Sequence, residues 1–135
     1  MIVVDTNVIA YLYINGERSQ QAEDLLVKDS EWIAPKLWLS EFRNVLSLYL
    51  RKNLLTLDEI LCILQQAEAL LAHHEYKVAS AEVMELVNSS NCSAYDCEFV
   101  ALARHLDIRL VTVDKKIIKD FPNIAIALED FLQKY

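Results

Sequence analysis

Glycine and proline are almost absent from this chain, with one glycine and two prolines in 135 residues. Because these residues interrupt helices and strands, their scarcity predicts regular elements joined by short polar loops. No apolar run is long enough to span a membrane, and no basic segment precedes a cleavable apolar stretch. Hydrophobic residues make up 54% of the chain, so we expect one domain over residues 1–135 with a core that needs no disulfides.

Cysteine and positive charge are also scarce. Cys62, Cys92 and Cys97 are odd in number and match no zinc-binding spacing, so we expect three reduced thiols in a cytoplasmic protein. Lys and Arg number 13 against 20 Asp and Glu, which gives a net charge of -7. This balance disfavours a general nucleic-acid binder, because phosphate contacts need cations. It suits a site of carboxylates around a cation, or a basic partner surface.

The chain does contain an alternation of short β-branched runs and amphipathic helices. Strands are expected at residues 1–4, 32–34, 76–78, 109–113 and 124–126. Helices are expected at residues 6–13, 19–28, 37–52, 57–72, 80–87, 94–106, 115–120 and 128–133. Thr56, Ser80 and Ser93 are expected to cap three of these helices, and Pro35 to stop the second strand. The order predicts an α/β fold with three layers, α/β/α, and a central parallel sheet.

Four acids stand at special places in this order. Asp5 and Asp114 each follow an apolar strand and precede a helix, and Asp5 could also serve only as a cap of that helix. Asp96 lies in the first turn of a helix, where the helix dipole stabilises an acid without any function. Glu41 lies within the apolar arc of the 37–52 helix, where a carboxylate either pairs with a buried Arg or lines a cleft.

All four acids are expected at one edge of the sheet. The carboxyl ends of parallel strands share an edge, and ligands of open α/β sheets bind there. Clustered carboxylates repel one another unless a cation neutralises them. Oxygen ligands select Mg²⁺ or Mn²⁺, and such a metal can position and acidify a water for attack on a phosphodiester. No Ser/His/Asp set, P-loop or dinucleotide fingerprint suggests another reaction.

Four segments of the sequence resemble the PIN domain, and within it the VapC-type toxins of toxin–antitoxin pairs. They are VVDTNVIA at the N-terminus, LSEFRNVL around Glu41, AYDCEFVALA around Asp96 and LVTVDKKI around Asp114. The resemblance covers nearly the whole chain. It implies that Asp5, Glu41, Asp96 and Asp114 are the catalytic, metal-binding acids for one or two Mg²⁺ or Mn²⁺ ions. It also implies a supporting set, which comprises Thr6, Asn7, Ser93 and Thr112.

The resemblance implies a metal-dependent endoribonuclease, a hydrolase that leaves a 5′-phosphate and a 3′-hydroxyl. It further implies a homodimer and a cognate antitoxin that covers the cleft. Arg43, Lys115 and Lys116 lie near the acids and are candidates to hold RNA, with ordinary surface residues as the other reading of the two lysines. The apolar arc of residues 37–49 is wider than one core-facing stripe needs, so it either marks an interface or is enclosed in the core.

Other readings of the same residues stay open. A PIN-fold protein can be catalytically silent and bind RNA or a protein. A phosphatase of the haloacid dehalogenase class would need a second Asp two residues after Asp5, where this chain has Asn7. A purely structural scaffold would leave Glu41, within an apolar arc, without a role.

Overall fold

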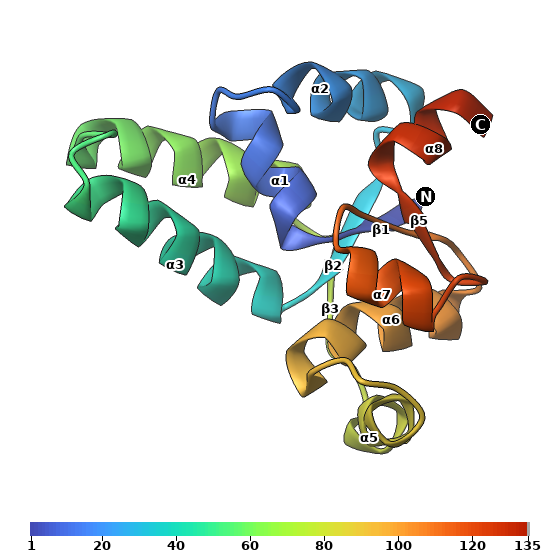
Figure 1. Ribbon diagram of the computed structural model, residues 1–135. Coiled ribbons are helices and arrows are strands. Elements are labelled where there is room, and N and C mark those ends of the chain that lie inside the picture. Colours follow the sequence, from blue (N-terminus) through green and yellow to red (C-terminus); the bar gives the residue numbers. More distant parts are fainter. Residues whose placement is uncertain (135) are drawn as a thin grey trace.

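A central sheet of five parallel strands organises the computed structural model, which describes residues 1–134 (Figure 1). Tyr135, the last residue of the expected domain, lies outside the described residues. The strands are β1 (Ile2–Val4), β2 (Trp32–Pro35), β3 (Glu75–Tyr76), β4 (Leu110–Thr112) and β5 (Ala125–Ala127). Their order across the sheet is β3-β2-β1-β4-β5, and every neighbouring pair is parallel. The expected three-layer α/β fold is confirmed.

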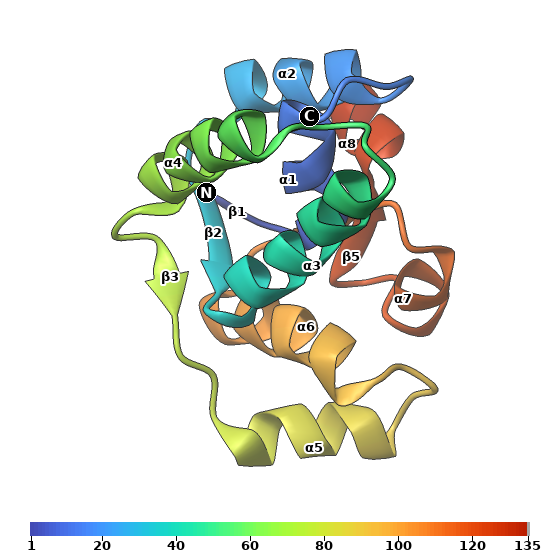
Figure 2. The same cartoon turned by 90° about the vertical axis from the view of Figure 1, so that its left-hand side faces the viewer.

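Eight helices surround the sheet within residues 1–134. They are α1 (Thr6–Tyr13), α2 (Ser19–Lys28), α3 (Leu37–Arg51), α4 (Leu57–Leu71), α5 (Ser80–Asn88), α6 (Ala94–Leu106), α7 (Lys115–Asp120) and α8 (Leu128–Lys134). Helix α6, with α5 outside it, covers one face of the sheet, while α1, α2 and α4 lie on the other side (Figure 2). Within this range no helix combines the length and apolar character that a bilayer crossing requires.

The strand order places a topological switch at the centre of the sheet. The chain adds β2 and β3 on one side of β1 and then returns to add β4 and β5 on the other. Neighbouring connections therefore leave β1 and β4 in opposite directions, which opens a crevice at the carboxyl ends of these two strands. Asp5 directly follows β1 and Thr112 ends β4, so both residues border that crevice.

The core is built from the residues that the apolar runs predict. All residues of β1 and β2 are buried, including Trp32. Trp38 of α3 is also buried. Packing of α6 on β1, β2 and β4 encloses Phe99 and Val100. A continuous core across both faces of a sheet explains why the strand sequences are apolar without alternation.

The residues predicted to cap helices and to end the second strand are confirmed in part. Thr56 caps α4 in a full capping box with Glu59, and the Ser93 hydroxyl accepts from the backbone N–H of Asp96 at the start of α6. The expectation for Ser80 is wrong, because α5 already begins there and Ala79 holds the cap position without a side-chain hydrogen bond. Strand β2 does end at Pro35, but Pro35 is its last residue and not the first residue after it, and it pairs with Tyr76 of β3.

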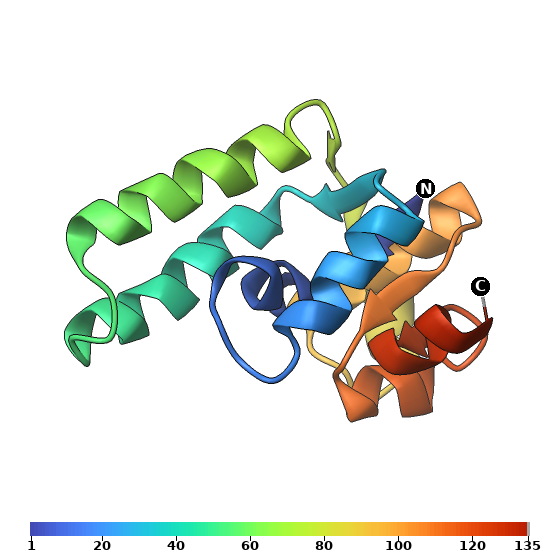
Figure 3. The same ribbon diagram turned by 90° about the horizontal axis from the view of Figure 1, so that it is seen from above.

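Helices α3 and α4 form a hairpin that extends beyond the end of the sheet (Figure 3). Only Trp38, Phe42 and Leu46 of α3 are buried. Several large apolar side chains of the hairpin are exposed, namely Leu48, Leu50, Leu54, Leu57 and Leu61. The alternative in which the core encloses the whole apolar arc is therefore wrong, because the outer part of the hairpin has no sheet beneath it.

Candidate active site

Asp5 is the centre of the site, at the point where β1 turns into α1. Its Oδ1 accepts a hydrogen bond from the backbone N–H of Thr6 at 2.8 Å. Its Oδ2 accepts from the hydroxyl of Thr112 at 2.7 Å and from Nδ2 of Asn7 at 3.3 Å. Asp5 caps α1, but its hydrogen bond from Thr112 of β4 plays no part in capping a helix. Both carboxylate oxygens are thus held in place, by donors from one helix, α1, and one strand, β4.

Glu41 is linked to Asp5 through Thr6. The Thr6 hydroxyl donates to Oε1 of Glu41 at 2.7 Å, while the Thr6 backbone N–H holds Asp5. A buried ion pair was one of the two explanations for a carboxylate in this apolar arc. Glu41 does not form one, because every ion pair within residues 1–134 involves other residues. Glu41 is half-buried and faces other acids.

Three carboxylates interact at this edge of the sheet. Burial raises the pKa of Asp5 to about 6 from its ordinary 3.8, against hydrogen bonds from Thr112 and Thr6 that lower it. The charges of Glu41 and Asp96 raise it further. Burial also raises the pKa of Glu41, with added contributions from Asp96 and Glu98. Burial and mutual repulsion therefore both disfavour the charged forms of these acids.

Asp96 and Asp114 differ in what their carboxylates contact. The Asp96 backbone N–H is capped by Ser93, and its half-buried side chain makes no hydrogen bond to Ser93 in return within the described chain. The Asp114 side chain instead accepts from the backbone N–H groups of Lys116 and Ile117. The structure thus brings Asp5, Glu41 and Asp96 into electrostatic range, while Asp114 caps its own helix.

Asp114 is nevertheless joined to the site through Thr112. The Thr112 hydroxyl accepts from the Asp114 backbone N–H at 3.0 Å and donates to Asp5. It also lies 3.4 Å from Nδ2 of Asn7. Thr112 is fully buried. One hydroxyl therefore ties the ends of β1 and β4 together, across 107 positions of sequence.

Glu98 is a site residue that sequence reasoning missed. It is half-buried on α6, burial raises its pKa, and its charge raises the pKa of Glu41. Residues two apart on a helix point in different directions, so the position of Asp96 gave no signal for Glu98. Only the packing of α6 against the rest of the site brings the two glutamates together.

The donor set fits a hard divalent cation. It consists of carboxylate oxygens whose negative charges repel, with no Lys or Arg ion pair to Asp5, Glu41, Asp96 or Asp114 among residues 1–134. No three His, Cys, Asp or Glu side chains in that range form a ready-made group around an ion. Mg²⁺ does not require such a group, because it keeps several waters and uses one or two carboxylates together with substrate phosphates.

The three candidate RNA-holding residues lie on the surface. Arg43, on α3, is exposed, and so are Lys115 and Lys116, which open α7. The backbone N–H of Lys116 is bound to Asp114, but the ion pairs within residues 1–134 include none of these three cations. They are therefore available to an external anion, and their role stays a prediction.

Comparison with known proteins gives a consistent result. The family model described as PIN domain matches residues 2–124. Ribonuclease VapC3 of Pyrobaculum aerophilum is 32% identical over 127 residues, which are 92% of this chain and 97% of that protein. Among solved structures, PAE2754 from Pyrobaculum aerophilum has a TM-score of 0.72 at 17% identity, covering 98% of this chain and 94% of that one. FitAcB from Neisseria gonorrhoeae has a TM-score of 0.75 at 17% identity, with coverage of 96% and 99%. The expected resemblance is confirmed, and this chain belongs to the PIN domain family.

Proposed function

We propose that this protein is a Mg²⁺- or Mn²⁺-dependent endoribonuclease and the toxin of a toxin–antitoxin pair. The observation that carries the proposal is Asp5, a buried carboxylate held by three donors and facing the charges of Glu41 and Asp96. A relative that is 32% identical to this chain bears the name of a ribonuclease. A PIN domain with this group of acids supports hydrolysis of a phosphodiester.

Asp5, Glu41 and Asp96 would hold the metal, and Asp114 would complete the set. The bound cation would supply an acidified water and stabilise the negative charge that develops at phosphorus. Thr112 and Asn7 orient one oxygen of Asp5, and the Thr6 N–H orients the other. The Thr6 hydroxyl holds Glu41. These neutral donors position two carboxylates without adding a charge that would compete with the cation.

Arg43, Lys115 and Lys116 would contact the phosphates that flank the bond to be cut. A protein with a net charge of -7 needs such local cations, because its overall field repels RNA. All three side chains are exposed, and their distribution over α3 and α7 would place them on two sides of the acids.

The partners that we propose are a cognate antitoxin and a second copy of this chain. The exposed leucines at the outer end of the α3–α4 hairpin support a protein partner, since exposed large apolar side chains on one part of a surface are typical of interaction sites. Light scattering on the chain alone would report a mass near twice 15.5 kDa for a homodimer. A mass near the monomer value would leave this surface to the antitoxin.

The test is cleavage of a mixed pool of short RNAs with Mn²⁺, in parallel with EDTA and with Asp5→Asn. We expect cutting that both EDTA and Asp5→Asn abolish. Asp24→Asn is the matched control, because it removes an exposed carboxylate of α2 and should keep full activity. If the protein binds Mn²⁺ and RNA without cutting, the PIN-fold binding module is the correct function. Cutting that persists in EDTA would refute the metal-dependent mechanism.

A further inference from the structure

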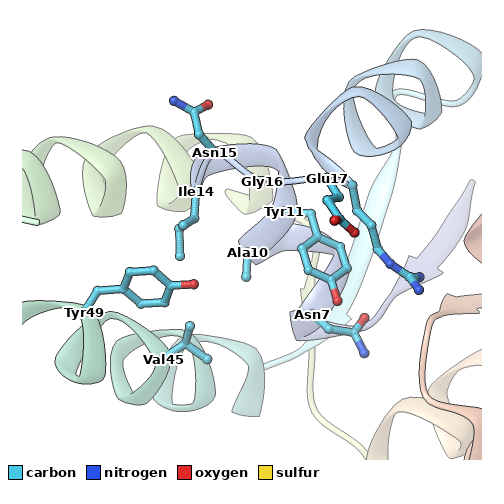
Figure 4. A pocket seen from close by; sticks show the side chains of 10 residues that line it. Asn7, Ala10, Tyr11, Ile14, Asn15, Gly16, Glu17, Val45 and Tyr49 are labelled. Carbon is cyan, nitrogen blue, oxygen red and sulfur yellow. The ribbon is translucent and has the colours of Figure 1, made fainter. Parts of the chain in front are cut away.

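A pocket of about 410 Å³ adjoins the acids between α1, the loop that follows it and α3. Its lining includes Tyr11 and Tyr49, which face it from opposite helices, and Asn15 from the loop (Figure 4). Asn7 belongs both to this lining and to the network around Asp5. The pocket is therefore a direct extension of the candidate active site.

The Asn7 amide divides the pocket from the acids. Its Nδ2 donates to Asp5 and lies within hydrogen-bond distance of Thr112. Its Oδ1 is buried and is the only buried side-chain oxygen or nitrogen within residues 1–134 that has no hydrogen-bond partner. The oxygen lies on the side of Tyr11, and the nitrogen is turned away from it (Figure 4). The network is thus complete towards the acids and incomplete towards the pocket.

The pocket combines flat rings with polar groups. The Arg18 guanidinium lies over the Tyr11 ring, with Cζ 5.9 Å from the ring centroid, and neither Arg18 nor Glu17 belongs to an ion pair within residues 1–134. The lining has one positively charged residue, Arg18, and one negatively charged residue, Glu17, so its net charge is zero. The carboxylates of the active site repel a polyanionic ligand, but an uncharged part of that ligand can therefore bind in this pocket.

We propose that this pocket binds one unstacked base of a single-stranded RNA, adjacent to the bond that is cut, and so sets the sequence preference of cleavage. The proposal rests on the ribonuclease function proposed above. Proteins recognise single-stranded RNA by stacking bases on aromatic or guanidinium planes and by hydrogen bonds to base edges. Tyr11 and Arg18 supply the planes, and Asn15 and Glu17 supply groups for the base edge.

The experiment measures the nucleotides that flank the cut bonds after digestion of a random-sequence RNA pool with Mn²⁺. It then measures KM and kcat on the preferred short RNA. We expect Tyr11→Leu, which removes the ring but keeps apolar bulk, to lose the preference at one flanking position and to raise KM about tenfold. The kcat should change much less, because the acids are intact. Tyr11→Phe keeps the plane and should keep the preference.

Arg18→Ala is a second variant, on an exposed side chain whose loss should not disturb folding. We expect it to weaken the same preference, while Arg51→Ala, an equal loss of charge at the end of α3, should not. Unchanged preference and KM in both Tyr11→Leu and Arg18→Ala, with cleavage intact, would overturn the pocket proposal and leave the ribonuclease. If RNA parameters are unchanged but a co-expressed protein partner is released, the pocket belongs to that partner. Absence of cutting by the unmodified protein would refute the function itself, and the base pocket with it.

Discussion

Replacement of Asp5 by Asn tests the electrostatic account of the site through the stability of the fold. The Asp5 carboxylate has a pKa of about 6 in the folded protein against an ordinary 3.8. Between these values the folded state binds more protons than the unfolded state, so the free energy of unfolding falls as pH rises. At pH 7 the charged carboxylate lowers it by roughly 3 kcal/mol, at about 1.4 kcal/mol for each pKa unit.

The substitution also alters the hydrogen bonds that hold the side chain. Asp5 accepts from Thr6 on one oxygen and from Thr112 and Asn7 on the other, whereas Asn has only one acceptor oxygen. One side of the network is lost, at roughly 1 kcal/mol or more. We therefore expect Asp5→Asn to stabilise the metal-free protein by about 1–2 kcal/mol at pH 7 and to destabilise it by about 1 kcal/mol near pH 4.

Urea unfolding at several pH values in EDTA measures this difference. Trp32 and Trp38 are fully buried, so their fluorescence reports the transition, and linear extrapolation gives the free energy. Asp24→Asn, which removes an exposed carboxylate, should follow the unmodified protein across the range. An Asp5→Asn effect that is the same at pH 4 and pH 7 would refute the raised pKa and, with it, the idea of an electrostatically strained carboxylate.

Two further predictions concern the metal and Thr112. Millimolar Mn²⁺ should raise the Tm of the unmodified protein, because a ligand of the native state stabilises it. Glu41→Gln should reduce that rise and weaken a calorimetric Mn²⁺ titration, and an unchanged titration would limit the metal site to the aspartates. Thr112→Val replaces a fully buried hydroxyl that contacts Asp5 and Asp114. It should lower the free energy of unfolding by about 1–3 kcal/mol and lower kcat. If both quantities stay unchanged, Thr112 does not position Asp5.

Sequence reasoning predicted features that depend on near neighbours. The apolar run before Asp5 and the capping box of Thr56 with Glu59 are set by residues within four positions, and both formed as expected. The same reasoning failed at Ser80, where the neighbouring residues allow either position as the helix start. Local propensity favours a helix in this region, but it leaves the first residue of the helix open by one or two positions.

The sequence by itself determined the fold class, the family and the positions of the acids at strand ends and helix starts. Tertiary structure decided which groups meet: Thr112 with Asp5, Glu98 with Glu41, and Asn7 with both the acids and the pocket. It also separated the buried Trp38 from the exposed Leu48 on one apolar helix. Periodicity gives the direction of a side chain around its own element. Distances between elements depend on strand order and helix packing, and these arise from contacts between residues far apart in the chain.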